Sequence, residues 1–146
     1  MLYDAGEWGA GELLLDGDLL LWHELPEDGK LPIGSHPIGD RLSSYFAGDS
    51  VAFADVDLDI SWCTPFQRDV AEALQGVPRG ETITYGELAA LAGHPGAHRA
   101  AGTFCAQNRF PIVLPCHRVV AVGGLGGYGA LGPAYKQRLL ALEGVR

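Results

Sequence analysis

The sequence predicts an α+β fold with a small antiparallel β-rich N-terminal domain, residues 1–60, and a helical C-terminal domain, residues 61–146. Three observations carry this prediction: a hairpin pattern near the N-terminus, two helix-start signals after residue 63, and a change of charge. The first 60 residues hold 13 acidic side chains against Lys30 and Arg41, a net charge of −11, and the rest of the chain carries a net charge of +3. Only the second part is suited to a polyanionic partner such as nucleic acid.

The composition is that of a globular protein that buries a core, with 47% hydrophobic and 19% charged residues in a chain of 146. No apolar stretch approaches the roughly 20 residues of a transmembrane helix, and the acidic N-terminus does not resemble an export signal. The three cysteines are Cys63, Cys105 and Cys116. An odd, widely spaced set without a CxxC pair argues against a disulfide framework and against a zinc site. We therefore expect a cytoplasmic protein without a metal.

The elements of the first domain follow from turns and periodicity. Two apolar runs flank Asp16-Gly17-Asp18 and predict a β-hairpin over residues 12–22. Proline and glycine predict a loop over residues 26–39, which is followed by a short helix from Arg41 to Phe46. Apolar alternation predicts a further strand from Val51 to Ile60, although the period is broken at residues 54–57.

Two capping boxes open the helices of the second domain. Thr64-Pro65-Phe66-Gln67 predicts a helix start with proline at the first helical position, and Thr84-Tyr85-Gly86-Glu87 predicts a second one. A third helix, rich in small residues, is predicted from His94 to Ala106, and a final helix from Pro133 to Gly144. The second and third helices form a helix-turn-helix pattern. Spacing alone favours a helical hairpin packed inside its own domain.

Cys116 is the candidate nucleophile. The apolar run from Phe110 to Leu114 predicts a buried strand that delivers Cys116 to the edge of the core, beside His117 and Arg118. Positive charge and a proton-accepting imidazole favour a reactive thiolate. The alternative is a small buried hydrophobe. Adjacent side chains of a regular strand point to opposite faces, so either the chain turns at Cys116 or a water relays the proton to His117.

Seven blocks in order resemble one known family. They are Pro115–Val119, Thr64–Gln67, Gly80–Ala89, His98–Gly102, Asn108, Gly126–Gly129 and Leu142–Gly144. Together they resemble the O6-alkylguanine-DNA alkyltransferases, also called methylated-DNA–protein-cysteine methyltransferases, over essentially all of residues 61–146. The first 60 residues resemble the family loosely, through Leu42–Gly48, and are shorter than its N-terminal domain. The resemblance implies a ribonuclease H-like N-terminal domain and a winged helix-turn-helix in the DNA-binding and alkyl-transfer domain.

The resemblance also implies a function. An alkylated guanine is flipped out of double-stranded DNA, and its alkyl group is transferred directly, stoichiometrically and irreversibly to Cys116. O4-alkylthymine is a second expected substrate. No cofactor or metal is implied, and a monomer is expected. One alternative is a lesion-binding protein of the alkyltransferase-like type, against which Cys116 argues. Another is a cysteine hydrolase, which would need an oxyanion hole and repeated turnover.

Carried over by position, the resemblance assigns catalytic roles to four residues. Cys116 is the nucleophile, and His117 is the base that deprotonates it through a water. Glu143 orients His117, as the third member does in other activated nucleophiles. Its place in a helix's last turn is unfavourable for the helix dipole, which favours a specific role. Asn108 braces the site by side-chain hydrogen bonds; its alternative is an ordinary turn asparagine.

The resemblance assigns DNA contacts and a base pocket to other residues. Arg99 matches an intercalating arginine, and Tyr85 matches a tyrosine that rotates the phosphate and bonds to the base. The alternatives are a solvated surface arginine and core packing. Gly102 keeps the third helix narrow enough for a minor groove about 6 Å wide. The pocket-lining positions are Pro111, Val119, Tyr128 and Gly129. Cys63 and Cys105 have no role in the family, and we expect both to be buried packing residues.

Overall fold

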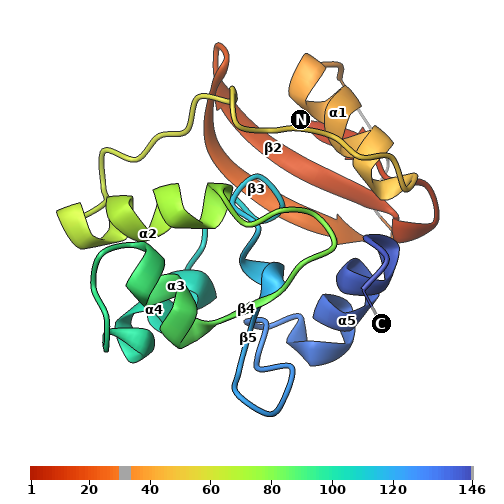
Figure 1. Cartoon of the computed structure of the whole chain (residues 1–146). Coiled ribbons are helices and arrows are strands. Elements are labelled where there is room, and N and C mark those ends of the chain that lie inside the picture. Colours follow the sequence, from red (N-terminus) through yellow and green to blue (C-terminus); the bar gives the residue numbers. More distant parts are fainter. Residues whose placement is uncertain (30–33, 146) are drawn as a thin grey trace. The chain divides into compact units, whose positions relative to one another are not determined.

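The computed structural model describes residues 1–29 and 34–145. The predicted α+β class is confirmed as a mixed α/β fold, with five α-helices and a small antiparallel sheet within these residues (Figure 1). The chain forms two compact units. The first combines Met1–Asp59 with Arg109–Val113, and the second contains Ile60–Asn108 and the chain from Leu114 onward. Within the described ranges, no helix is long and apolar enough to cross a membrane.

The first unit is built on a three-stranded antiparallel sheet in the order β1-β2-β3. Its strands are β1 (Leu2–Asp4), β2 (Ala10–Asp16) and β3 (Leu19–Glu27), and a short 3₁₀ turn, η1 (Gly6–Trp8), joins the first two. Asp16 pairs with Leu19 across the turn, so the predicted hairpin is confirmed. β3 runs longer than predicted, into the segment expected to be loop.

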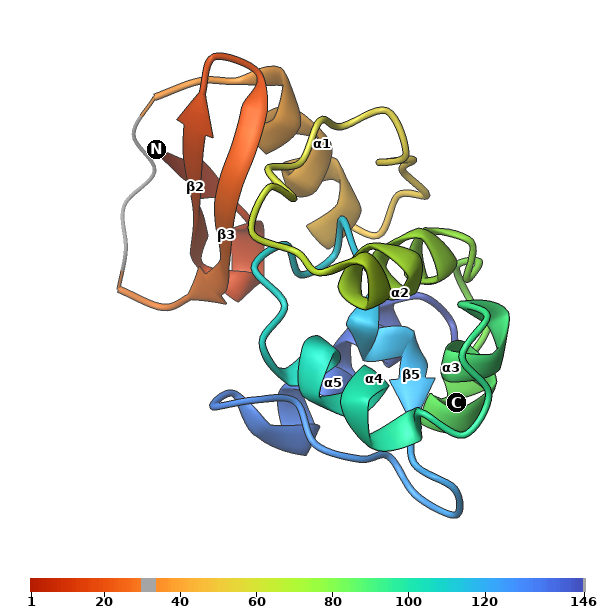
Figure 2. The same cartoon turned by 90° about the vertical axis from the view of Figure 1, so that its left-hand side faces the viewer.

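Helix α1 (Pro37–Phe46) lies against one face of this sheet (Figure 2). It begins earlier than the predicted Arg41, because Pro37 occupies its first turn and the His36 imidazole accepts a hydrogen bond from Ile38 N at 3.1 Å. Ile38, Leu42, Tyr45 and Phe46 form its buried face. Part of the loop predicted over residues 26–39 lies outside the described residues.

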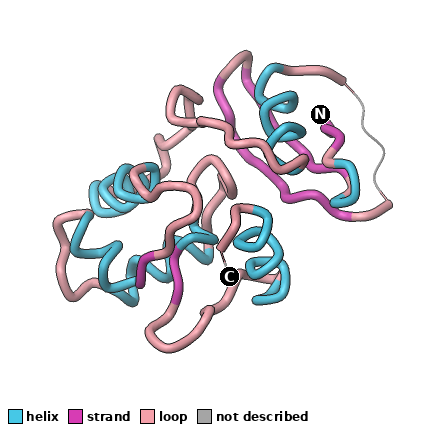
Figure 3. The backbone as a smooth tube through the Cα atoms, turned by 45° about the vertical axis from the view of Figure 1, so that its right-hand side comes forward, coloured by secondary structure: helices cyan, strands magenta, loops and turns pink. Residues whose placement is uncertain are grey.

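The strand predicted from Val51 to Ile60 is wrong. This segment is loop (Figure 3) with one isolated bridge, in which Leu20 N donates to Asp57 O and Asp59 N donates to Leu20 O. The break in apolar alternation at residues 54–57 is the physical reason, because a strand with one buried face needs a continuous period of two.

The second unit contains the four other helices. α2 (Pro65–Gln75) and α3 (Tyr85–Leu91) each begin at the predicted capping box, with both reciprocal hydrogen bonds present. α4 (His98–Ala106) begins four residues later than predicted, because residues 94–97 form a turn in which Ala97 N donates to His94 O. α5 (Gly132–Leu142) is the final helix.

A short parallel pairing positions the two parts of the second unit that carry the candidate site. β4 (Ile83–Thr84) pairs with β5 (Val119–Val120). β4 leads directly into α3 at Tyr85, and β5 directly follows a 3₁₀ turn, η2 (Cys116–Arg118). The two-residue ladder therefore brings Tyr85 and Cys116 into one region although they are distant in sequence. Strands this short leave no periodic signal in the sequence.

The strand predicted from Phe110 to Cys116 is also wrong. The chain turns within this segment, and Ile112 adopts a φ of 72°. A β-branched residue rarely adopts such a backbone conformation, and it is incompatible with a continuous strand. Residues 110–116 are nevertheless all buried. The apolar run correctly indicated that these residues are buried. A short apolar run does not by itself show whether the buried segment is a strand.

Candidate active site

Cys116 is buried at the first position of η2. Its backbone N donates to Leu114 O at 2.8 Å, and the chain turns here rather than continuing as a strand. The turn removes the geometric objection that neighbouring side chains on a strand point to opposite faces. Cys116 and His117 are both buried within the second unit.

Asn108 donates a hydrogen bond to the candidate nucleophile, Cys116. Its amide Nδ2 donates to Leu114 O at 2.9 Å and to Cys116 Sγ at 3.1 Å. An amide carries two N–H donors, so one group both fixes the chain before the cysteine and contacts the sulfur. A hydrogen bond donated to sulfur favours the thiolate over the thiol. Asn108 thus has the position that its predicted bracing role requires.

His117, Glu143 and Arg118 form a buried cluster. Nε2 of His117 lies 2.8 Å from Glu143 Oε2, and Arg118 donates to both carboxylate oxygens, from Nε at 2.8 Å and from Nη2 at 2.9 Å. Arg118 also donates to Val77 O at 2.7 Å. The bidentate arginine and the imidazole compensate the desolvation of the Glu143 carboxylate, whose side chain is fully buried at the end of α5.

The cluster fixes the tautomer of His117. A carboxylate that is bound by Arg118 can only accept hydrogen bonds, so Nε2 of the imidazole carries the proton. Nδ1 therefore carries the lone pair and is the basic nitrogen. Burial lowers the pKa of His117, although the Glu143 carboxylate opposes the effect. At neutral pH the side chain is an uncharged base.

Burial raises the pKa of the Cys116 thiol, which at neutral pH is protonated in the unliganded protein. The hydrogen bond from Asn108 and the charge of Lys136 act in the opposite direction, followed by the Tyr128 hydroxyl. The site therefore holds a thiol and a neutral imidazole, and the nucleophile must be generated by moving a proton within the site. This arrangement is typical of a cysteine activated by an adjacent base.

Lys136 also belongs to the candidate site, although no motif in the sequence predicted it. Lys136 is 0% exposed, and its Nζ donates to Gly127 O at 3.3 Å and to Tyr85 Oη at 3.4 Å. The ammonium also lies 5.6 Å from the centroid of the Tyr85 ring. A signal existed: Lys136 precedes Leu139 and Leu140 by three and four residues, which puts it on the buried face of the helix.

A cavity of about 240 Å³ adjoins Cys116. Small residues dominate its wall, and two tyrosines supply the larger surfaces. Gly126 lies close to this wall, where a Cβ would come within 3.4 Å of Lys136 Nζ and 3.3 Å of Tyr85 Oη. The lining residues are Tyr85, Gly102, Cys105, Ala106, Cys116, Gly127, Tyr128 and Gly129.

The structure brings some predicted residues to this cavity and not others. Tyr85, Gly102, Tyr128 and Gly129 lie in its wall with Cys116. Val119 is buried in β5, and Pro111 belongs to the first unit; neither lines the cavity. Cys105 corrects an expectation, because it lines the cavity instead of being a packing residue. Cys63 is buried as expected.

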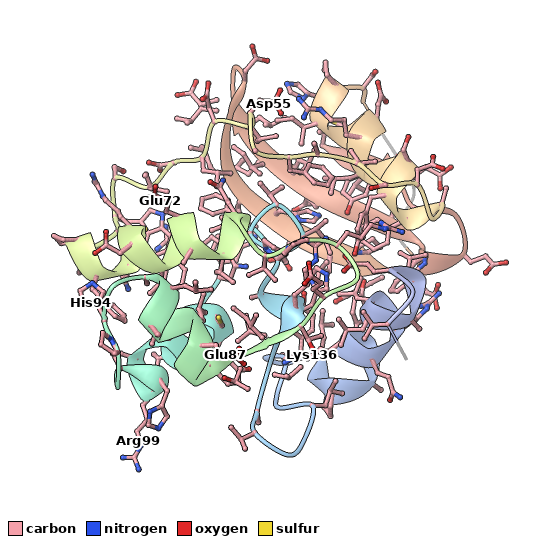
Figure 4. The ribbon with its side chains drawn as sticks, viewed as in Figure 1. Asp55, Glu72, Glu87, His94, Arg99 and Lys136 are labelled. Carbon is pink, nitrogen blue, oxygen red and sulfur yellow. The ribbon has the colours of Figure 1, made fainter. Side chains whose placement is uncertain are left out.

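Arg99 lies outside the cavity, on the exposed side of α4, and its side chain extends away from the helix (Figure 4). Lys136, also labelled there, turns inward from α5. Gly102 faces the Tyr85 ring across an ordinary contact distance, since a Cβ at this position would lie 3.7 Å from the ring. One face of α4 therefore borders the cavity while Arg99 projects from the helix into solvent.

The fold and the site define a protein with a buried cysteine thiol in the wall of a small cavity. Residues 65–145 match the family model of the 6-O-methylguanine DNA methyltransferase, DNA binding domain. A methylated-DNA–protein-cysteine methyltransferase of Mycolicibacterium paratuberculosis is 50% identical over 105 residues, and one of Methanothermobacter thermautotrophicus is 40% identical over 119. These alignments cover 71% and 81% of this chain, and 62% and 66% of the two relatives. The chain thus spans less than two thirds of the length of these relatives.

Solved structures agree over nearly the whole chain. The crystal structure of Mycobacterium tuberculosis OGT in complex with DNA has a TM-score of 0.80 and 37% identity, covering 98% of this chain and 91% of that one. The O6-methylguanine-DNA methyltransferase of Pyrococcus kodakaraensis also has a TM-score of 0.80, at 28% identity and 99% and 98% coverage. This chain belongs to the 6-O-methylguanine DNA methyltransferase family.

Proposed function

We propose that this protein repairs double-stranded DNA by transferring an alkyl group from O6-alkylguanine to Cys116 in one irreversible turnover. The observation that carries the proposal is the Cys116 thiol in the wall of a cavity, beside a neutral His117 that a buried carboxylate orients. Family membership supports DNA as the substrate. O4-alkylthymine, whose alkyl group is bonded to an equivalent exocyclic oxygen, is a second substrate in this proposal.

The chemistry balances without a cofactor. The Cys116 proton passes through a water to Nδ1 of His117, and the thiolate attacks the alkyl carbon while the bond from that carbon to O6 breaks. The electron pair of that bond stays with guanine, which takes up the proton that Cys116 gave to His117, relayed back through water, and remains in the DNA as an unmodified neutral base. The thioether formed has no leaving group that water could displace under mild conditions, so Cys116 is consumed. One protein therefore repairs one lesion.

The side chains around the sulfur would supply the remaining functions. Asn108 and Lys136 both favour the thiolate that forms during transfer. Burial raises the pKa of Tyr85, so its hydroxyl remains a hydrogen-bond donor for the base in the cavity. The glycines that line the cavity let the backbone approach a flat base closely, and the Gly129 amide would face the base.

DNA recognition would fall to residues 61–146, with α3 and α4 as a winged helix-turn-helix. α4 carries small residues, including Gly102, that suit the minor groove, and the exposed Arg99 would occupy the space that the flipped base leaves. Residues 1–60 would form the ribonuclease H-like N-terminal domain. We further propose that the protein is a monomer and that it is cytoplasmic. Its three free cysteines support the cytoplasm, since disulfides are rare in that compartment.

Mass spectrometry of the intact protein tests the proposal directly. The protein is mixed with a duplex that contains one O6-methylguanine, and a matched duplex with guanine serves as the control. We expect one methyl group on Cys116 per molecule, and none on Cys116→Ser. Lesion binding without a mass change would instead identify a binding protein, and release of several products per molecule would identify a hydrolase.

A further inference from the structure

The segment Arg109–Val113 lies between Asn108 and Leu114 in the chain but belongs to the first unit. Two of the contacts that attach it there are hydrogen bonds with one residue of β3. His23 N donates to Arg109 O at 2.9 Å, and the His23 side chain bonds Pro111 O through Nδ1 at 2.6 Å. His23 is 2% exposed, and the proposed chemistry does not use it.

The protons of this contact are fixed by its partners. A carbonyl oxygen can only accept, so Nδ1 of His23 carries the proton and donates to Pro111 O. Nε2 then has the lone pair, and the Tyr3 hydroxyl donates to it at 2.7 Å. Gly11 leaves the space for this arrangement, because a Cβ at that position would collide with the Tyr3 ring. The imidazole is therefore a rigid, fully bonded bridge from β1 to the segment.

The two ends of the same segment meet at the nucleophile. Asn108 precedes it and Leu114 follows it, and the Asn108 amide donates to Leu114 O and to Cys116 Sγ. Between them the chain passes through Ile112, the one non-glycine residue with a positive φ in the described ranges. A strained conformation persists only where its surroundings hold it. A displacement of the segment would therefore move the amide that contacts the sulfur.

We propose that His23 is a positioning residue for Cys116, holding the Arg109–Val113 segment so that Asn108 can reach both Leu114 O and the sulfur. This inference rests on the proposed transfer to Cys116, and it adds that the hydrogen bonds from His23 to this segment contribute to the reactivity of the cysteine. Small displacements at a reacting centre cost up to about 100-fold in rate.

Two substitutions at one position separate this role from simple packing. The Asn side-chain nitrogen stands where Nδ1 of histidine does, so His23→Asn keeps a donor for Pro111 O. The polar end of Gln reaches the place of Nε2, so His23→Gln keeps the Tyr3 contact and loses the donor. The first measurement is the reaction of Cys116 with iodoacetamide against pH, followed by peptide mapping. It does not depend on alkyl transfer from DNA.

The second measurement is the transfer rate constant at saturating methylated duplex, with the Kd for DNA measured separately. We expect His23→Gln to lower both rates at neutral pH by about tenfold or more and to shift the thiol's pH profile to higher pH, with Kd unchanged. Asn108→Ala should give the same profile. His23→Asn should stay within about threefold of the unmodified protein. Tyr3→Phe removes only the hydroxyl that bonds His23 Nε2. It is a milder variant and should lower the reaction rate of Cys116 slightly.

The matched control is Ile38→Val, which removes a buried methyl group from α1 in the same unit. It should lower stability without changing the Cys116 profile. Equal Cys116 rates in His23→Asn and His23→Gln, whether both normal or both reduced in step with stability, would overturn the proposal. If the unmodified protein takes no methyl group from DNA, the proposed function fails, while the iodoacetamide profiles still decide the role of His23.

Discussion

Glu143 Oε2 lies 2.8 Å from Nε2 of His117, and neither side chain exposes any surface to water. The same carboxylate is held by Arg118, so the imidazole shares its partner with a permanent cation. Burial is the main cause of the lowered pKa of His117, and the positive charge of Arg118 acts in the same direction. With a lowered pKa, the His117 imidazole is neutral at physiological pH. It can then accept the proton of Cys116 in the proposed transfer.

Glu143→Gln tests this shared carboxylate. The amide oxygen can still accept from His117, but the partly buried Arg118 loses its counter-charge. Breaking a fully buried pair costs about 3–5 kcal/mol, which is an upper bound here. We expect a transfer rate lowered by about 10- to 100-fold and a lower midpoint in urea unfolding. The exposed Glu72→Gln in α2 is the control. Normal transfer by a well-folded Glu143→Gln protein would exclude the orienting role of the carboxylate.

Lys136→Met tests the buried ammonium. Methionine keeps much of the volume and removes the charge, so the pKa of Cys116 should rise further, because the attraction of Lys136 for the thiolate is lost. We expect transfer at pH 7 to fall by about tenfold and to recover in part at higher pH. The exposed neighbour Gln137→Met should behave like the unmodified protein. A rate deficit of equal size at every pH would show that Lys136 acts by another route.

Cys105 provides a test of selectivity between two thiols in one cavity. Burial raises the pKa of Cys105 far above that of an exposed thiol, and the neighbouring Cys116 adds to the effect. We expect Cys105 to remain protonated and to receive no methyl group, so Cys105→Ala should still transfer one methyl group at a rate within about threefold of normal. Peptide mapping after the reaction shows which of the two cysteines carries the methyl group. Methyl found on Cys105 would mean that either sulfur can act.

His23 predicts a pH-dependent stability that belongs to the first unit. Burial lowers its pKa from 6.5 to about 4, although its bond to Pro111 opposes the change. Between those pH values the unfolded chain binds a proton that the folded protein does not, so stability is complete above pH 6.5 and falls toward pH 4. The shift corresponds to about 3 kcal/mol.

Urea unfolding at several pH values measures this effect. His117 and acidic groups also titrate as the pH falls, so the informative quantity is the difference between the unmodified protein and His23→Gln. That difference should shrink between pH 6.5 and 4, because the variant has no imidazole to protonate. Parallel curves for the two proteins would show that His23 is already protonated in the fold or is more accessible than its burial indicates.

Features encoded within a few residues were predicted well. The capping boxes at Thr64 and Thr84 located the starts of α2 and α3, because a cap needs only the side chains of one helical turn. The block around Cys116 led to the proposed reactive centre in the same way, from a few adjacent residues. Lys136 could have been found from its place among the leucines of α5.

Features that depend on distant partners were predicted poorly. The pairing of Ile83 with Val119 leaves no local trace. The residues from Phe110 to Cys116 are buried, but the chain turns at Ile112 instead of forming a strand. The segment Val51–Ile60 pairs with β3 at only one bridge. Sequence periodicity reports which side chains avoid water, whereas the path of the backbone there is decided by residues elsewhere in the chain.

The bond between His23 and Pro111 also constrains the order of folding. The two residues are 88 positions apart, so during synthesis β3 leaves the ribosome long before the carbonyl that its imidazole requires. Until that carbonyl is present, the Nδ1 donor of His23 lacks the acceptor that the complete unit supplies, and a buried donor without an acceptor costs about 1–3 kcal/mol. The N-terminal unit is thus completed only after most of the chain has been made, and its maturation and that of the segment leading to Cys116 are a single late event.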